Sequence, residues 1–362
     1  MHAAINALCL GNRSGTGRYT EGLINGFVEL ADREVRLSVF IPSHFPISPK
    51  WWRTTQVRFY SIPIPTAWHR VVWEQWFSQG WLKKLKPDLL HSPAFVVPLF
   101  RRGPYRQIIT IHDLAFLRFP QTLPAGRRRY LAIAATRSMR LADAIITDSR
   151  AIQREVQEQV NRPEKVAAVP LGVNPALFHT HPTLEDEKIL ESLGVQRPYF
   201  LFAGTIEPRK NLSRILSAYL QARREGVKPN LVIAGRLGWK HDTIPLYQEG
   251  VVGVGFVTDA KLAALYRHAE SLLAPSLYEG FDLPVVEAAA CGTPVICSDI
   301  PVHHELFGEE GRYISVEDEE GWKKAFISPD NWNPSSRAGE IRGWTDAARD
   351  LLECYRRVIV SD

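Results

Sequence analysis

The stretch LYEGFDLPVVEAAACGTPVICSD, residues 277–299, is the most informative part of the sequence for the fold. It holds two acidic residues, Glu279 and Glu287, with seven residues between them, at the start of an otherwise apolar run. Pro284 suits the first turn of a helix, where a backbone N–H has no intrahelical partner. Gly292 can supply the left-handed residue that ends many helices. The stretch therefore predicts a turn and then a buried helix, with a carboxylate on either side of the helix start.

Apolar segments, many rich in β-branched residues, alternate with longer segments of helical periodicity along the rest of the chain. This pattern is typical of a parallel sheet covered by helices on both faces. We therefore expect an α/β fold of two doubly wound parallel-sheet halves. The predicted strands lie at 2–10, 35–41, 88–94, 107–113, 143–149, 199–204, 230–235, 251–256, 271–276 and 294–299, with helices such as 17–31 and 127–141 between them.

The length of 362 residues suits two domains. The join is expected in residues 169–198, which contain prolines and glycines and no sustained apolar period. A last helix over about 343–360 carries apolar residues at helical spacing, and this periodicity alone allows it to pack on either half.

The composition, with 45% hydrophobic and 23% charged residues, is that of a soluble globular protein. The four cysteines form no C-x-x-C pair and lie beside no histidine at metal-ligand spacing, so we expect reduced thiols in a cytoplasmic protein. The segment MHAAINALCLG lacks a cationic lead-in and is expected to form a first strand rather than a signal peptide. No run approaches the ~18 apolar residues that a membrane span needs.

Charge is distributed unevenly along the chain. Residues 1–170 carry 24 Lys and Arg against 12 Asp and Glu, whereas residues 171–362 carry 20 against 27. A strongly basic half attracts anionic partners such as a membrane leaflet, a phosphorylated lipid, an acidic polymer or a nucleic acid. A basic surface that is merely solvated is the alternative. Helix 127–140, basic at its ends and apolar in the middle, is the best candidate for contact with an anionic membrane.

The turn before Pro284 is a candidate ligand site. In an open parallel sheet, ligands bind at the carboxyl ends of the strands, where this turn must lie. Backbone N–H groups and the helix dipole attract an anion there, and Asp282 is the only local residue that could cap the helix. A carboxylate can accept two hydrogen bonds from the vicinal hydroxyls of a ribose or hexose. Together, Glu279 and Glu287 indicate a ligand with a phosphate between two sugars.

The block between these two glutamates resembles the E-G-F-x-L-P-x-x-E-A motif of the retaining glycosyltransferases of family 4. The resemblance covers nearly the whole chain and includes residues 142–149, 169–178, 202–212, 292–299 and 344–359. It implies a GT-B fold, in which two Rossmann-like domains face a cleft. Residues 1–175, together with a returning helix at 343–362, would bind the acceptor, and residues 190–342 would bind the nucleotide-sugar.

The resemblance also implies roles for residues of the carboxyl-terminal half. Glu287 should hold the ribose hydroxyls, and Glu279 a hydroxyl of the transferred hexose. Arg209 and Lys210 precede a helix capped by Asn211 and should neutralise the leaving diphosphate. The donor's sugar and pyrophosphate should also contact the turns that contain Gly204, Thr205, Gly280, Phe281, Asp282 and Leu283.

Two of these positions depart from the family pattern. Thr205 follows Gly204, where many members have arginine, so we expect Arg209 to replace that cation. Asp282 stands where glycine is commoner. Since a carboxylate would repel a diphosphate, we expect the Asp282 side chain to face a sugar hydroxyl or to cap the helix.

The amino-terminal half supplies a loop and a strand end to the site in this family. Gly15, Thr16 and Gly17 follow the first strand in a loop that lets backbone approach the acceptor and the donor phosphate. His112 and Asp113 end the strand at 107–113, and by the resemblance His112 is a catalytic residue beside the transferred sugar. From the residues alone, His112 could equally be a buried structural histidine. Other histidines and two tryptophans are interpreted as structural: surface or loop positions for His179, His181, His303 and His304, and core positions for Trp73 and Trp76.

The resemblance implies a retaining glycosyltransferase that moves a hexose from a nucleotide-sugar to a glycan or lipid-linked glycan. The GTIEPRKN and EGFDLP variants favour mannose from GDP-mannose, with a UDP-hexose as the other class of donor. No metal, cofactor or nucleic acid is expected, and contact with the inner face of a membrane would be peripheral. Two alternatives stay open: another enzyme on this scaffold, such as a nucleotide-sugar epimerase or a phosphorylase, and a non-catalytic module that binds polyanions or membranes.

Overall fold

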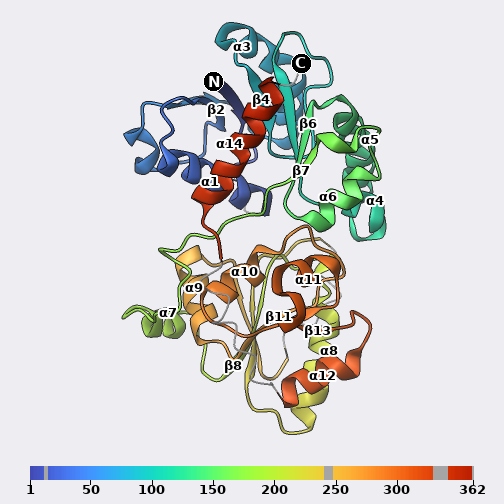
Figure 1. Cartoon of the computed structure of the whole chain (residues 1–362). Coiled ribbons are helices and arrows are strands. Elements are labelled where there is room, and N and C mark those ends of the chain that lie inside the picture. Colours follow the sequence, from blue (N-terminus) through green and yellow to red (C-terminus); the bar gives the residue numbers. More distant parts are fainter. Residues whose placement is uncertain (12–14, 240–247, 329–340, 361–362) are drawn as a thin grey trace. The chain divides into compact units, whose positions relative to one another are not determined.

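The computed structural model describes residues 1–11, 15–239, 248–328 and 341–360. The chain divides into two units (Figure 1). Unit 1 comprises Met1–Arg118, Ala125–Gly172 and Arg342–Asp362, and unit 2 comprises Phe119–Pro124 and Val173–Ile341.

Unit 1 is built on a parallel sheet whose seven described strands have the order β3-β2-β1-β4-β5-β6-β7. The apolar segments form strands because most of their side chains, on both faces, are buried beneath helices. The strands are β1 (His2–Asn6), β2 (Arg36–Pro42), β3 (Val57–Ile62), β4 (Leu89–Ser92), β5 (Arg106–Ile111), β6 (Ala144–Thr147) and β7 (Val166–Ala168). The helices are α1 (Gly15–Leu30), η1 (Pro49–Arg53), α2 (Ala67–Val72), η2 (Trp73–Phe77), α3 (Ser78–Leu85), α4 (Ala115–Arg118), α5 (Ala125–Leu141), α6 (Arg150–Gln157), η4 (Pro163–Lys165) and α14 (Trp344–Val360).

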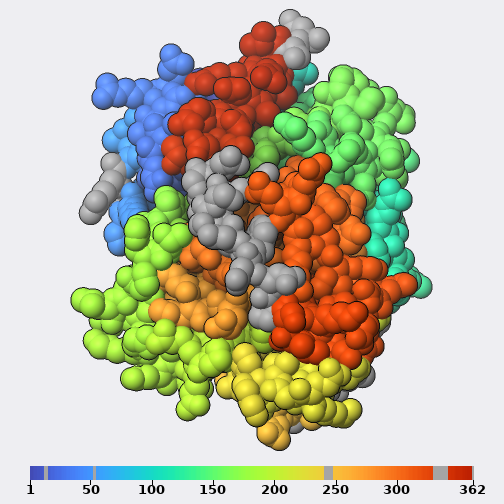
Figure 2. Space-filling model, turned by 60° about the horizontal axis from the view of Figure 1, so that its bottom comes forward, coloured from blue at the N-terminus to red at the C-terminus, as the bar shows by residue number. Residues whose placement is uncertain are grey.

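The last helix returns to the first unit, as the resemblance implied. α14 packs against α1, and the two lie side by side in Figure 1, while Figure 2 shows the red atoms of α14 next to the blue atoms of the first part of the chain. Gly22 and Gly26 allow this approach: a Cβ on Gly22 would lie 2.1 Å from the Trp344 ring, and a Cβ on Gly26 would lie 2.2 Å from the Trp344 carbonyl oxygen. Tyr355 of α14 is fully buried.

Residues 67–85 form one helical run in which α2 and α3 are joined by the π-helical turn η2. Trp73 is buried, but Trp76 is 59% exposed, so the prediction that both belong to the core is wrong for Trp76. A π turn holds more residues than an α-helical turn, and a spacing of three no longer keeps two side chains on one face.

Unit 2 contains a second parallel sheet, whose six described strands have the order β10-β9-β8-β11-β12-β13. Phe200, Phe202, Tyr219, Trp322 and Phe326 are central to its core, with the Phe200 and Phe326 rings edge-to-face at 4.9 Å. The strands are β8 (Tyr199–Ala203), β9 (Asn230–Ala234), β10 (Val251–Gly255), β11 (Ser271–Ala274), β12 (Val295–Ser298) and β13 (Arg312–Ile314). The helices are η3 (Pro120–Thr122), α7 (Asp186–Ser192), η5 (Pro208–Lys210), α8 (Leu212–Arg224), α9 (Asp259–His268), α10 (Leu283–Ala290), α11 (Pro301–Phe307), η6 (Gly308–Glu310) and α12 (Glu319–Ile327).

The predicted α/β architecture is confirmed, and each of the ten predicted strands is present. The sequence pattern does not predict the short or half-exposed strands β3, β7 and β13. None of the helices in the described part of the chain is long and apolar enough to cross a membrane.

Candidate active site

Three neighbouring strands of unit 2 bring distant residues to one edge of its sheet. β8, β11 and β12 are adjacent and parallel, with Leu272 of β11 paired to Leu201 on one side and Val295 on the other. Because parallel strands end at the same edge, the segments that follow them meet there. The predicted residues Gly204–Lys210 and Glu279–Leu283 belong to two of these segments.

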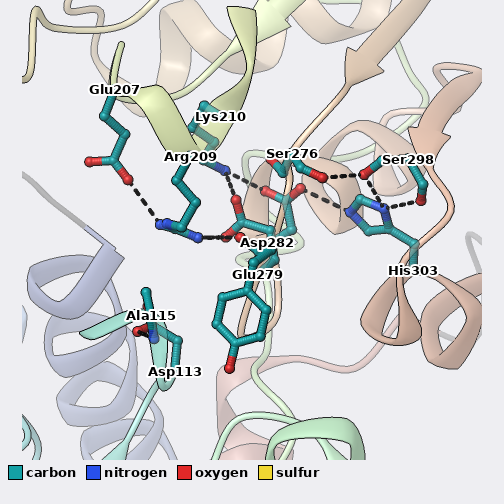
Figure 3. A network of polar contacts seen from close by, with 11 residues as sticks. Asp113, Ala115, Glu207, Arg209, Lys210, Ser276, Glu279, Asp282, Ser298 and His303 are labelled. Carbon is teal, nitrogen blue, oxygen red and sulfur yellow. Dashed lines mark hydrogen bonds and ion pairs between the residues drawn. The ribbon is translucent and has the colours of Figure 1, made fainter. Parts of the chain in front are cut away.

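Glu279 lies between the two predicted cations (Figure 3). Its Oε2 accepts a hydrogen bond from Arg209 Nη1 at 2.7 Å, and its Oε1 lies 2.8 Å from Lys210 Nζ. Arg209 also donates to the Tyr278 carbonyl oxygen at 2.6 Å and to Glu207 Oε1 at 3.0 Å. The Arg209 and Lys210 side chains are only 15% and 12% exposed, so these contacts fix both cations in place.

Asp282 and His303 extend this cluster. Asp282 Oδ1 accepts from Lys210 Nζ at 2.9 Å, and Asp282 Oδ2 lies 3.2 Å from His303 Nε2. His303 Nδ1 lies 2.8 Å from the Ser298 carbonyl oxygen, so both ring nitrogens face acceptors, an arrangement that favours the charged imidazolium. Burial opposes this charge, but the hydrogen bond with Asp282 prevails and raises the pKa of His303 to about 10. Burial would likewise raise the pKa of Asp282, yet Lys210 and His303 hold it well below its usual range.

Two predictions about nearby residues, His303 at the surface and Asn211 as a helix cap, are wrong, and one of the two alternatives for Asp282, capping of the helix, is excluded. His303 is not a surface histidine but is completely buried, because the end of the sheet brings it to Asp282. Asp282 stands at the amino end of α10, with a φ of 72°, but its side chain does not cap the helix because Lys210 and His303 engage both carboxylate oxygens. Asn211 precedes α8 without capping it, and its side chain instead donates to the Val316 carbonyl oxygen at 3.4 Å.

The helix predicted from the opening stretch is α10. Pro284 lies in its first turn, and Gly292 follows its end with a φ of 76°. Gly280, Phe281 and Leu283 are buried around its start. Glu287 is 2% exposed and lies about one turn further along, where its Oε2 accepts from Tyr266 Oη of α9 at 3.3 Å. Glu287 therefore contacts a different element from the cluster around Glu279.

Gly204 and Thr205 follow β8 and are partly buried. Gly204 has a φ of 145°, in the region that favours glycine. A Cβ there would lie 3.5 Å from Lys210 Cε, so the Lys210 stem runs past the Gly204 backbone.

The remaining predicted site residues belong to unit 1. Gly15, Thr16 and Gly17 form the first turn of α1, so the helix begins two residues earlier than the predicted helix 17–31, and Gly15 and Thr16 are helical rather than part of the predicted loop. The three residues before them lie outside the described ranges. Asp113 follows β5, and its Oδ1 accepts from the Ala115 backbone N–H at 3.0 Å.

His112 is held by two acceptors within unit 1. Its Nδ1 lies 2.7 Å from Asp148 Oδ2, and its Nε2 lies 2.8 Å from the Pro93 carbonyl oxygen. Burial alone would lower the pKa of His112, but the Asp148 carboxylate more than offsets this and raises it. The rings of Tyr19 and Phe95 pack edge-on against the imidazole. Both ring nitrogens of His112 therefore face acceptors, which fixes the orientation of the imidazole.

The cluster in unit 2 alternates in charge, from Glu207 through Arg209, Glu279, Lys210 and Asp282 to His303. Such an array can hold cations in place to stabilise negative charge on a ligand. Across the described ranges, no group of three or more His, Cys, Asp or Glu side chains is arranged to hold a metal ion.

Comparison with known proteins agrees with this architecture. A family model described as Glycosyltransferase Family 4 matches residues 13–177, and one described as Glycosyl transferases group 1 matches residues 197–328. The chain belongs to glycosyltransferase family 4. This glycosyltransferase is 27% identical over 296 residues to O-antigen chain mannosyltransferase B of Escherichia coli, with 77% of each protein covered.

Two further similarities concern a longer relative and the fold. The glycosyltransferase is 29% identical over 265 residues to the serotype-specific mannosyltransferase WbdA of Escherichia coli; the match covers 67% of this chain and 32% of WbdA. Its fold resembles that of sucrose-phosphate synthase from Thermosynechococcus elongatus, with a TM-score of 0.76, 18% identity and full coverage of both chains. The fold is therefore GT-B.

Proposed function

We propose that this glycosyltransferase transfers mannose from GDP-mannose, with retention of anomeric configuration, to a glycan or lipid-linked glycan. The two Escherichia coli relatives are named as mannosyltransferases, which supports mannose as the sugar. The observation that carries the proposal is the position of Arg209 and Lys210, which Glu279 and Asp282 hold beside the amino end of α10.

We assign the donor diphosphate to this position. The planar Arg209 guanidinium can donate two parallel hydrogen bonds to the diphosphate, and the Lys210 ammonium acts as a point charge. Arg209 takes the place of the arginine that many family members have at the position of Thr205. Backbone N–H groups around Gly280, Phe281 and Leu283 add to the positive field at the helix start. Glu279 would accept a hydrogen bond from a hydroxyl of the hexose, and Glu287 would accept hydrogen bonds from the ribose hydroxyls.

In the proposed mechanism, the acceptor hydroxyl attacks the anomeric carbon on the face from which the diphosphate leaves. The bond from the anomeric carbon to the diphosphate oxygen breaks, the bond to the acceptor oxygen forms, and the acceptor proton passes to the diphosphate. The protein stabilises the negative charge that develops on the leaving group, with the two cations in the role that a metal ion has in other enzymes. For unit 1, we assign His112 a catalytic role, and Gly15, Thr16, Gly17 and Asp113 that of acceptor and phosphate contacts.

The proposal is tested by incubating the purified protein with GDP-mannose, GDP-glucose, UDP-glucose and UDP-N-acetylglucosamine, each with a lipid-linked glycan extract. We expect wild-type protein to consume GDP-mannose and to form an α-linked product, which NMR spectroscopy of the anomeric proton identifies. Glu279→Gln should lose this turnover, whereas Glu191→Gln, an exposed position on α7, should keep it. Consumption of UDP-sugars alone would overturn the donor, and full activity in Glu279→Gln would overturn the site.

A further inference from the structure

Four large aromatic side chains of unit 1 are exposed on the helical run 67–85 and on the loop beside it. Trp68, Trp76, Phe77 and Phe100 have 70, 59, 64 and 54% of their surface exposed. The Trp76 and Phe100 rings stack on one another, with centroids 5.9 Å apart. Large apolar groups that gather at a protein surface commonly mark an interaction site.

The loop that carries Phe100 is fastened to the helical run. Gln75 Oε1 accepts from the Leu99 backbone N–H at 2.8 Å, and Gln79 Oε1 accepts from the Arg102 backbone N–H at 3.1 Å. Gln75 and Gln79 lie one helical turn apart, so they hold the loop along the helix. The stacked pair is thus part of a built surface rather than the tip of a free loop.

The opposite side of the loop is fastened to α5. Ser138 Oγ accepts from the Val97 backbone N–H at 3.2 Å, and Arg101 forms an ion pair with Asp143, just after α5, at 2.7 Å. The loop that carries Phe100 is therefore fastened to two helical segments, and Phe100 stacks on Trp76 of one of them.

The charges near these aromatic residues are strongly positive. Residues 61–106 contain seven Lys and Arg but only two acidic residues, Glu74 and Asp88. Glu74 is 3% exposed and is paired with Arg70 at 2.7 Å, so it adds no negative charge to the surface. Exposed cations on the same segments include Lys83 and Lys84 on α3 and Arg102 in the loop.

We propose that this surface, defined by Trp68, Trp76, Phe77, Phe100, Lys83, Lys84 and Arg102, binds an anionic lipid bilayer. Aromatic rings settle at the boundary between headgroups and acyl chains, and Lys and Arg attract anionic headgroups. A second copy of the chain is a poorer partner, because two basic rims would face one another. This surface differs from helix 127–140, the membrane contact that the sequence predicts. This proposal of membrane binding does not depend on which sugar the enzyme transfers.

Flotation of the full chain with vesicles tests this proposal. Vesicles of phosphatidylcholine with 30% phosphatidylglycerol are compared with pure phosphatidylcholine at low and high salt. We expect the wild type to bind the anionic vesicles and to dissociate at high salt. Trp76→Ser with Phe100→Ser should lower the partition coefficient by at least about tenfold, since both rings are half or more exposed. The matched control is Leu184→Ser, at a 95% exposed position of unit 2.

A second variant tests the contribution of the positively charged side chains to membrane binding. Lys83→Gln, Lys84→Gln and Arg102→Gln together should lower binding to anionic vesicles by about a hundredfold, because each cation near the surface contributes about 1 kcal/mol. Arg224→Gln, Lys228→Gln and Lys324→Gln, three exposed cations of unit 2, should have no such effect. Binding that is equal in wild type and both surface variants would overturn the proposal. So would a wild-type dimer that Trp76→Ser with Phe100→Ser converts to monomers, because the surface would then join two copies.

Discussion

Lys210 shows how a single residue depends on its neighbours at the proposed donor site. Its Nζ lies within 2.9 Å of carboxylate oxygens of both Glu279 and Asp282. Burial would lower the pKa of Lys210, but Asp282 and Glu279 outweigh it and raise the pKa well above its usual value. The ammonium group therefore stays charged at neutral pH. A fixed buried cation of this kind suits the stabilisation of a leaving diphosphate.

Lys210→Met should lower kcat for sugar transfer by about 10²–10³-fold, the usual effect of removing one group that stabilises developing charge. Methionine retains the length of the stem without the charge. The rate is measured as nucleotide release from GDP-mannose at saturating donor. Lys188→Met serves as the control, since that side chain is 71% exposed on α7. A fall of less than threefold in Lys210→Met would show that Lys210 does not stabilise the leaving group.

His303→Gln should lower the free energy of unfolding more at pH 6 than at pH 10. The pKa of His303 is raised from 6.5 to about 10 in the folded protein, so the imidazolium's contribution is complete below pH 6.5 and is lost as the pH rises through 10. Urea unfolding of wild type and variant at pH 6, 8 and 10 measures the difference, with the exposed His304→Gln as control. A difference that stays constant with pH would indicate that His303 contributes packing alone.

At the scale of elements, the strands that the sequence predicts are mainly those whose side chains are buried on both faces of the sheet. The three unpredicted strands, β3, β7 and β13, are all at sheet edges. In β3, polar Arg58 and Ser61 interrupt the apolar residues because edge strands are half solvated, and β7 and β13 have only three residues each. Apolar periodicity carries little information about such strands.

The same distinction applies to the candidate site. The elements that carry Glu279, Arg209 and Lys210 could be predicted, because each follows a strand that the sequence pattern predicts. The partner of Asp282 could not, since His303 is 21 residues away and meets it only through the order of strands in the sheet. One feature of the sequence indicated that Asp282 needs a partner. Asp282 stands where the family commonly has glycine, and a carboxylate that is buried requires a cation beside it.

The contact between α1 and α14 depends on two glycines, and Gly26→Ala should destabilise unit 1 by about 1–3 kcal/mol. The added methyl group would lie 2.2 Å from the Trp344 carbonyl oxygen, a backbone atom that moves only if α14 moves. Gly126→Ala in α5 is the control, because a Cβ there meets nothing within 4 Å and alanine favours a helix. Chemical unfolding measures both variants. Equal stability of Gly26→Ala and wild type would mean that α14 is not packed as described.

At the scale of the whole molecule, each unit holds its own set of buried charges. His112 and Asp148 pair within unit 1, whereas Arg209, Lys210, Glu279, Asp282 and His303 form one cluster within unit 2. The basic excess lies in residues 1–170, which belong to unit 1 except for residues 119–124 and include the proposed membrane surface. The proposed donor site and the proposed membrane surface therefore lie in different units, and we expect different variants to remove them.

The most direct test of the proposed donor site is calorimetric titration of wild type and Lys210→Met with GDP and with guanosine. If Lys210 binds the diphosphate, the variant should lose at least about tenfold in affinity for GDP and none for guanosine, because only GDP carries the charge that the ammonium group attracts. UDP and uridine, titrated in the same way, identify the base. Equal affinities of wild type and variant for both nucleoside diphosphates would contradict the assignment of the diphosphate to this cluster.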